Sequence, residues 1–191
     1  MSSSSVSDPV VFEVYFAPAG EEANMESDVP RVALVCVRNA GRSQMSAAFA
    51  RREAERSEAS NRASGRSERS ERRHARREAD RRDLDVEVVT GGTDPADAVP
   101  PGVIEVMDER GIDLSGREPR EIPTDELESC RLVATMGCST LELDADTDVR
   151  DWALPDPDGE DLDRVREIRD EAERRVREVF DELEGETAVE G

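Results

Sequence analysis

One segment of this chain reads Cys36-Val37-Arg38-Asn39-Ala40-Gly41-Arg42-Ser43-Gln44, and the organisation of the rest follows from it. The segment lies between a short apolar run, Val32–Val35, and an amphipathic segment, Met45–Arg52. This order predicts a buried strand, a tight loop and a helix. The loop therefore brings its backbone N–H groups and the positive end of a helix dipole to one point.

Two side chains of this loop carry its chemistry. Cys36 is the first residue of the loop, and Arg42 follows six residues later. The helix N-terminus, the backbone donors and the guanidinium group should all favour the thiolate form of Cys36. The same groups form a cradle for a tetrahedral oxyanion, to which Arg42 can donate two parallel hydrogen bonds. The alternative interpretation is a buried cysteine that ends a strand and serves only packing.

The spacing Cys-x5-Arg-Ser directly after a strand resembles the phosphate-binding loop of low-molecular-weight protein tyrosine phosphatases and their arsenate reductase relatives. The continuation Ser43-Gln44-Met45 resembles the reductase branch. The resemblance implies that Cys36 is the nucleophile, that Arg42 clamps the oxyanion and that Ser43 hydrogen-bonds the thiolate. The oxyanion-binding residues that it implies are Val37, Arg38, Asn39, Ala40, Gly41, Arg42 and Ser43. Arg38 departs from the pattern, since many relatives have glycine there.

Further segments of regular pattern predict the fold class. Strands are expected at 84–89 and 132–136 and around 149–152, and a long amphipathic helix is expected at 162–183. Alternating strands and helices predict a single α/β domain, a four-stranded parallel sheet with helices on both faces, as in the low-molecular-weight phosphatases. Ligands bind such sheets at the carboxyl ends of the strands, where the loops with Cys36, Cys138 and Asp156 can converge.

A general acid is needed opposite the thiolate, because cleavage at a tetrahedral centre requires a proton for the leaving oxygen. Asp156-Pro157 resembles the Asp-Pro loop of the family, in which this aspartate is the acid, and Trp152 strengthens the match. The surrounding segment is rich in aspartate, so Asp151 and Asp158 are the alternatives.

Cys138 separates two possible enzymes. Arsenate reduction needs a second thiol to attack the Cys36 sulfur and form a disulfide, whereas water completes a phosphatase turnover. Thr135-Met136-Gly137-Cys138 resembles the reductase motif that carries the resolving cysteine. Thioredoxin-coupled relatives have a third cysteine shortly afterwards, where this chain has Leu141-Glu142-Leu143. The external reductant is therefore left open between thioredoxin, a glutaredoxin-like protein and a small thiol, and no bound cofactor or metal is expected.

The composition indicates the character of the remaining segments. Residues 1–29 are expected to be a poorly ordered extension, 30–185 the enzyme domain, and 186–191 a tail. An Arg-rich, low-complexity insertion is expected at about 57–75, and residues 51–82 hold 12 of the 26 basic residues against 7 acidic ones. This insertion is either a partner-binding arm or a solvated loop or extended helix that pairs with the acidic body.

The net charge of −21 and the absence of lysine indicate a protein from a high-salt cytoplasm, in which screening suppresses repulsion between carboxylates. Such a charge argues against nucleic acid as a general partner. The chain has no apolar run long enough to span a membrane, and its three cysteines suit reactive thiols in a reducing cytosol. A cytoplasmic monomer is expected, with arsenate or phosphate as its ligand and a redoxin as a possible partner.

Three functions follow from these observations. The first is an arsenate reductase in which Cys36 attacks arsenate and Cys138 resolves the adduct. The second is a protein tyrosine phosphatase that acts through a phosphocysteine, although only 3% of the residues are aromatic and could hold a tyrosine ring. The third is a non-catalytic regulator that binds an anion or a partner through the Arg-rich segment.

Overall fold

The computed structural model describes residues 29–64, 85–137, 143 and 147–187, and of residues 57–64 and 187 only the backbone. Four parallel strands form one sheet in the order β2-β1-β3-β4. The strands are β1 (Arg31–Cys36), β2 (Glu87–Gly92), β3 (Leu132–Met136) and β4 (Asp148–Asp151). The helices are α1 (Arg42–Ser64), α3 (Pro101–Asp108), α4 (Thr124–Glu128) and α5 (Leu162–Thr187). The predicted fold class is confirmed.

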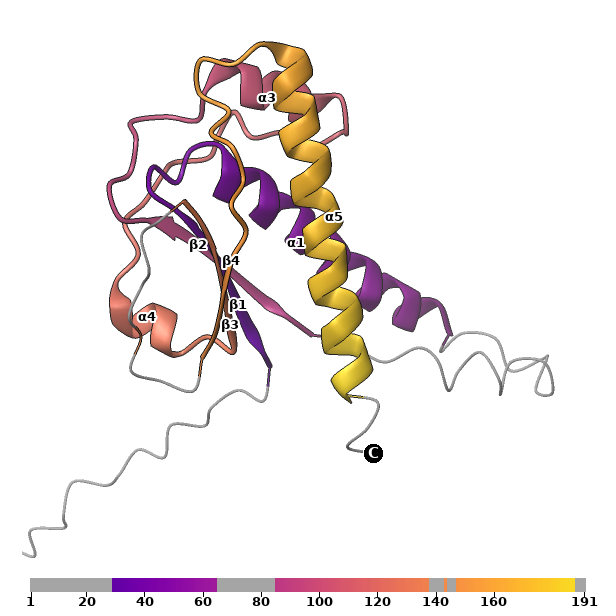
Figure 1. Ribbon diagram of the computed structural model, residues 1–191. Helices are drawn as coiled ribbons and strands as arrows, with labels where there is room; N and C mark the ends of the chain where they lie inside the picture. Colours follow the sequence, from indigo (N-terminus) through magenta and orange to yellow (C-terminus); the bar gives the residue numbers. More distant parts are fainter. Residues whose placement is uncertain (1–28, 65–84, 138–142, 144–146, 188–191) are drawn as a thin grey trace, which may run out of the picture.

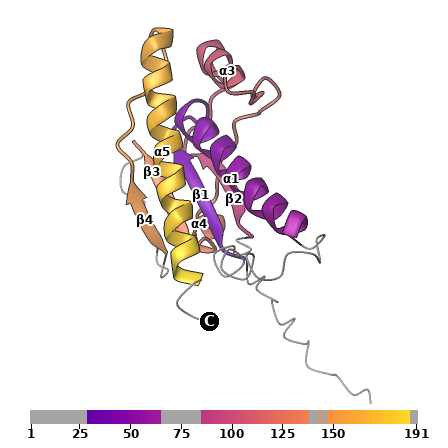
Figure 2. The ribbon, with the colours of Figure 1, turned by 90° about the vertical axis from the view of Figure 1, so that its right-hand side faces the viewer.

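The two long helices, α1 and α5, pack against each other on one face of the sheet (Figures 1 and 2). The short helix α4 lies on the other face, where its Leu127 joins a separate buried cluster with Ala33, Val35 and Val133. The larger cluster lies between the sheet and α1 and α5. Because side chains alternate across a strand, β1 contributes to both clusters and is buried on both faces.

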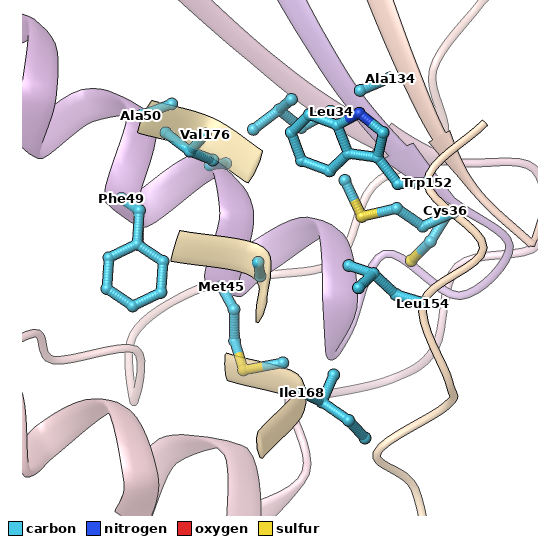
Figure 3. Close-up of a cluster of buried hydrophobic side chains, with 14 of the residues drawn as sticks. Leu34, Cys36, Met45, Phe49, Ala50, Ala134, Trp152, Leu154, Ile168 and Val176 are labelled. Carbon is cyan, nitrogen blue, oxygen red and sulfur yellow. The ribbon is translucent and has the colours of Figure 1, made fainter. Parts of the chain in front are cut away.

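The larger cluster reaches the end of β1 (Figure 3). Leu34 and Cys36 point into it, and so do Phe49 from α1 and Ile168 from α5. Trp152, which follows β4, is 5% exposed and belongs to the same cluster. The core therefore extends to the edge of the sheet at which the candidate catalytic loop begins.

Several boundaries differ from the sequence prediction. β2 begins at Glu87 rather than 84 and continues to Gly92, and α5 continues to Thr187. The sequence pattern did not predict α4, because five residues are too few for a helical period to be recognised. α1 continues to Ser64, which agrees with an extended helix at the start of the Arg-rich segment. Residues 1–28 of the expected extension and most of the expected insertion lie outside the described residues. Of the expected tail, 186–191, the first two residues belong to α5 and the others lie outside the described residues.

Candidate active site

The loop between β1 and α1 carries Cys36 at the last position of the strand and Arg42 at the first position of the helix. Cys36 is 1% exposed, and its Sγ lies 3.0 Å from the Ser43 hydroxyl oxygen. The Asn39 amide donates a hydrogen bond of 3.0 Å to the same oxygen. Since the Ser43 oxygen accepts from Asn39, its own hydrogen is available to the sulfur.

Asn39 connects the loop to the strand beside it. It is fully buried, and its φ of 46° lies in the left-handed region, which asparagine tolerates better than most residues. Its side-chain nitrogen also donates to the Thr90 hydroxyl of β2 at 2.9 Å, and its side-chain oxygen accepts from the backbone N–H of Arg120 at 3.0 Å. Gln44 donates to the same oxygen at 3.2 Å. These bonds fix the loop conformation, and with it the position of the Ser43 hydroxyl.

Arg42 links the loop to the segment after β4. Arg42 is 8% exposed, and its guanidinium group donates to the Leu154 carbonyl at 3.2 Å and to an Asp156 carboxylate oxygen at 2.7 Å. Gly137 lies directly against it, because a Cβ built on Gly137 would be 2.7 Å from the Arg42 Nη1 atom. The guanidinium is thus enclosed by backbone on one side and by a carboxylate on another.

Asp156 belongs to a loop that touches the Cys36 loop. A Cβ on Gly41 would lie 2.4 Å from the Pro157 Cγ atom, so the two loops meet where only glycine fits. The second carboxylate oxygen of Asp156 accepts from the Asp158 backbone N–H at 3.2 Å. The Asp156 side chain is about half exposed, which leaves its carboxyl group open to a bound molecule.

A pocket of about 550 Å³ lies between these loops. One wall consists mainly of small apolar residues from the segment that leads into α3. Arg38 and Asp97 add opposite charges, and no aromatic side chain is among the lining residues that the structure describes. The lining residues are Cys36, Arg38, Ala40, Gly41, Arg42, Ala96, Asp97, Ala98, Val99, Pro100, Pro101, Asp156 and Asp158. The pocket therefore combines a thiol, a guanidinium and a carboxyl group, which is a suitable set for a tetrahedral oxyanion.

The structure brings together four of the five residues that the sequence suggested for catalysis, namely Cys36, Arg42, Ser43 and Asp156. The fifth, Cys138, lies outside the described residues. Within the predicted oxyanion loop, Val37 packs toward the smaller core cluster and does not line the pocket. Among the described residues, no group of three potential ligands could hold a metal ion.

Sequence reasoning missed two contributors to the site. These are Thr90 and the Arg120 backbone, which hold Asn39 in place. A weak signal existed for Thr90, because it is a polar residue in a strand of otherwise apolar character. No signal existed for Arg120, since a backbone N–H can be assigned a partner only when the fold is known.

Comparison with known proteins identifies the class. The model of the family "Low molecular weight phosphotyrosine protein phosphatase" matches residues 59–189. The chain belongs to this family, as its cysteine loop predicted.

Several similar proteins are described as arsenate reductases. A Halobacterium salinarum protein described as "Putative arsenate reductase" is 58% identical over 152 residues, which cover 78% of this chain and 89% of that protein. Among solved structures, the Corynebacterium glutamicum thioredoxin-dependent arsenate reductase has a TM-score of 0.58 and 28% identity, over 82% of this chain and 63% of that one. An arsenate reductase in the phosphate-binding state has a TM-score of 0.54 and 25% identity, over 81% of this chain and 98% of that one.

Proposed function

We propose that this protein is an arsenate reductase. The observation that carries the proposal is the meeting of Cys36, Arg42 and Asp156 at one pocket, with the Arg42–Asp156 ion pair of 2.7 Å joining the two loops. Two relatives support it, because the Halobacterium salinarum protein and the Corynebacterium glutamicum structure are described as arsenate reductases. The absence of aromatic residues from the described pocket lining favours a small inorganic oxyanion over a phosphotyrosine ring.

In the first step, the Cys36 sulfur attacks arsenic and a hydroxide leaves. Asp156, in its protonated form and with Arg42 bound to the arsenate instead, donates the proton that makes this leaving group water. Arg42 and the loop N–H groups bind the arsenate oxygens, on which negative charge accumulates during the attack. Ser43 stabilises the Cys36 thiolate before the attack through its hydrogen bond to the sulfur. The product is an arsenic(V) adduct on Cys36.

In the second step, the Cys138 thiolate attacks the Cys36 sulfur. The sulfur–arsenic bond breaks with its electron pair on arsenic, so arsenic(V) becomes arsenite and a Cys36–Cys138 disulfide forms. Cys138 lies outside the described residues, but two neighbouring facts support its role. Cys36 pairs in register with Met136 on the adjacent strand, and Gly137 lies against Arg42. Cys138 therefore follows a residue that is part of the site.

An external thiol reduces the disulfide to complete the cycle. Thioredoxin, a glutaredoxin-like protein and a small thiol all supply the two electrons that the step needs. One similar structure is described as thioredoxin-dependent, which favours a redoxin. A reducing cytosol, in which such thiols are abundant, is the location that we propose. No helix among the described residues has the length and apolar character to cross a membrane.

The proposal is tested by measuring arsenite formation in molar salt with each thiol donor in turn. We expect Cys36→Ser to abolish turnover and Cys138→Ser to stop after one adduct per molecule. Cys130→Ser is the matched control, because Cys130 is buried in the smaller core cluster, and burial raises the pKa of its thiol. Continued arsenite release by Cys138→Ser would contradict the resolving role.

A second candidate function is phosphate-ester hydrolysis, which the family name and an acid opposite the nucleophile favour. It uses Cys36, Arg42 and Asp156 in the same way and does not need Cys138. Aryl phosphate cleavage that survives in Cys138→Ser, without arsenate turnover in the wild-type protein, would identify the phosphatase instead.

A further inference from the structure

The position of Asp156 depends on a short segment, Trp152–Leu154, that joins β4 to the acid loop. The Trp152 backbone N–H donates to the Thr135 carbonyl at 2.8 Å and so continues the pairing of β4 with β3. Two residues later, the Leu154 carbonyl accepts from Arg42. Between them, Ala153 has a φ of 36°, a left-handed conformation that residues with a Cβ adopt only when their surroundings hold them. The chain therefore changes direction here under constraint.

One side chain of α5 reaches this turn. The Arg175 guanidinium donates to the Trp152 carbonyl, and its Nε donates to a Glu171 carboxylate oxygen at 2.8 Å. The Arg175 side chain is 26% exposed, so the bond is partly shielded from water. Arg42 and Arg175, from two different helices, thus hold the carbonyl groups on either side of Ala153.

We infer that Arg175, oriented by Glu171, is a positioning residue that fixes the Trp152–Leu154 turn and thereby aims the Asp156 carboxyl group into the pocket. The inference rests on the proposed function, in which Asp156 is the acid. Proton transfer requires the donor within hydrogen-bonding reach of the leaving oxygen, and small displacements of a catalytic group reduce the rate strongly. Without Arg175, Arg42 would be the only described side chain that donates to a carbonyl group of the turn, and Arg42 must also bind the oxyanion.

Arg174 provides a matched control, because it binds the same Glu171 carboxylate, at 2.6 and 2.9 Å, but makes no contact with the turn. Three variants are compared: Arg175→Ala, Arg174→Ala and Arg175→Lys. A lysine keeps one charged donor that can reach the Trp152 carbonyl, so it should restore part of the effect.

The first readout is arsenate turnover. We expect Arg175→Ala to lower kcat about tenfold, a part of the hundredfold or more that general acids contribute. The inhibition constant for inorganic phosphate and the rate of Cys36 alkylation should change less than about twofold, because the oxyanion loop is intact. Arg174→Ala should leave kcat within about twofold of wild type, and Arg175→Lys should recover most of the loss. Equal loss of kcat in Arg174→Ala and Arg175→Ala would overturn the inference.

The second readout needs no activity. Trp152 is the only tryptophan of the chain, so its emission and its quenching by iodide report on this turn alone. We expect Arg175→Ala to shift the emission to longer wavelength and increase quenching, and Arg174→Ala to do neither. Unchanged Trp152 emission in Arg175→Ala would overturn the inference. A wild-type protein inactive on arsenate, with emission altered only in Arg175→Ala, would refute the proposed reduction and support the positioning of the turn.

Discussion

At the scale of single residues, the site depends on places where backbone lies unusually close to a functional side chain. Gly137 is the clearest case, because it combines a φ of +72° with contact to the Arg42 guanidinium. Gly41 has the same importance at the contact with Pro157. Such contacts set the distance between the nucleophile loop and the acid loop, and they leave no room for a methyl group.

Gly137→Ala should weaken oxyanion binding. Its Cβ would stand 2.7 Å from the Arg42 Nη1 atom, so the guanidinium must move. We expect the inhibition constant for inorganic phosphate to rise about tenfold or more, the equivalent of one strong charge-assisted hydrogen bond. Arsenate turnover measured at increasing phosphate concentrations gives this constant for each variant.

Gly111→Ala is the control for Gly137→Ala. Gly111 has a similar φ of +70°, but nothing lies within 4 Å of its added Cβ. Both substitutions should cost about 1–2 kcal/mol of unfolding free energy, because a residue with a Cβ is strained in the left-handed region. Only Gly137→Ala should alter phosphate inhibition, and an equal change in Gly111→Ala would contradict the argument.

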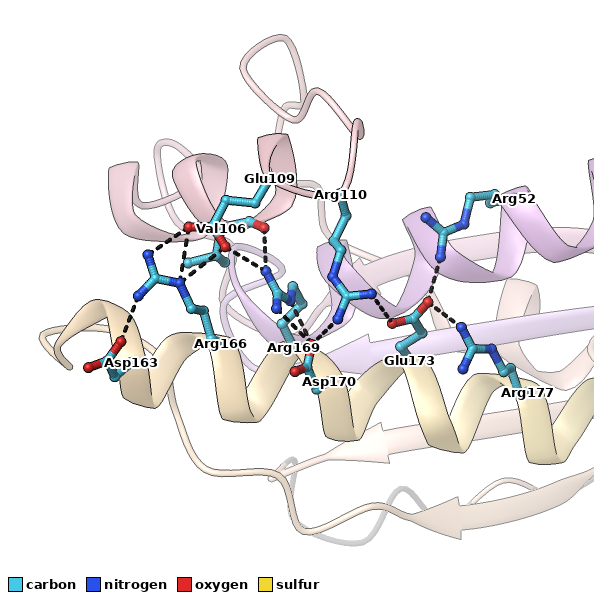
Figure 4. A network of polar contacts seen from close by, with 10 residues as sticks. All are labelled: Arg52, Val106, Glu109, Arg110, Asp163, Arg166, Arg169, Asp170, Glu173 and Arg177. Atoms are coloured by element: carbon cyan, nitrogen blue, oxygen red, sulfur yellow. Dashed lines mark hydrogen bonds and ion pairs between the residues drawn. The ribbon is translucent and has the colours of Figure 1, made fainter.

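At the scale of elements, α5 is attached to its neighbours by charge as well as by its apolar face. Arg169 is 5% exposed and donates to the Val106 carbonyl and the Glu109 carboxylate, at the end of α3 (Figure 4). Glu173 is 4% exposed and pairs with Arg52 of α1 and with Arg110. The three helices that cover the site thus share one connected network.

Glu173→Gln should destabilise the fold strongly. The buried carboxylate receives Arg52 at 2.6 Å, Arg177 at 2.5 Å and Arg110 at 3.2 Å. Loss of its charge leaves these partly exposed guanidinium groups without their common partner. We expect a cost of about 2 kcal/mol, between the values for an exposed and a fully buried pair. Chemical denaturation in molar salt measures the change.

Glu178→Gln is the matched substitution on the exposed side of the same helix, where Arg174 is the one ion-pair partner of Glu178 in the described part of the chain. An exposed pair contributes about 0–1 kcal/mol, so little change is expected. Equal losses for Glu173→Gln and Glu178→Gln would show that burial does not determine the strength of the network.

The pH dependence of stability should reveal the contact between α3 and α5. Hydrogen bonds from Arg166 and then Arg169 lower the pKa of Glu109 from 4.5 to about 2. A depressed folded-state pKa gives stability that is complete above pH 4.5 and is lost as the pH falls toward 2. Thermal melts across this range should therefore show a steeper decline for wild type than for Glu109→Gln. Parallel declines would contradict the assignment.

At the scale of the whole molecule, a net charge of −21 on 191 residues governs the response to salt. The similarity to a Halobacterium salinarum protein agrees with the halophilic character that the composition predicted. Carboxylate repulsion is screened within about 3 Å at molar salt but extends to about 10 Å at 0.1 M.

We expect the protein to unfold or lose activity below about 0.5 M salt, because unscreened repulsion penalises the compact state. Circular-dichroism melts in potassium chloride from 0.1 M upward measure this, with sucrose as a control for general solvent effects. Equal stability at low and molar salt would refute the halophilic interpretation without affecting the catalytic proposal.

The sequence alone determined the family, the fold class and the strand–loop–helix unit of the candidate site. These features are local, since the spacing of Cys36, Arg42 and Ser43 and the apolar runs of the strands can be recognised within a few residues of one another. It favoured Asp156 as the acid and kept Asp151 and Asp158 as alternatives. In the tertiary structure, Asp156 and Asp158 both line the pocket and only Asp156 of the three pairs with Arg42, whereas Asp151 accepts from the backbone N–H of Ala153.

Only the tertiary structure decided the contacts that hold the site in place. Asn39 meets Thr90 and the Arg120 backbone, and Arg175 meets the Trp152 carbonyl, across many residues of intervening chain. Each of these contacts depends on strand register and on where a helix crosses the sheet. A sequence pattern carries no record of either, because the partners have no fixed spacing and one of each pair is often a backbone group.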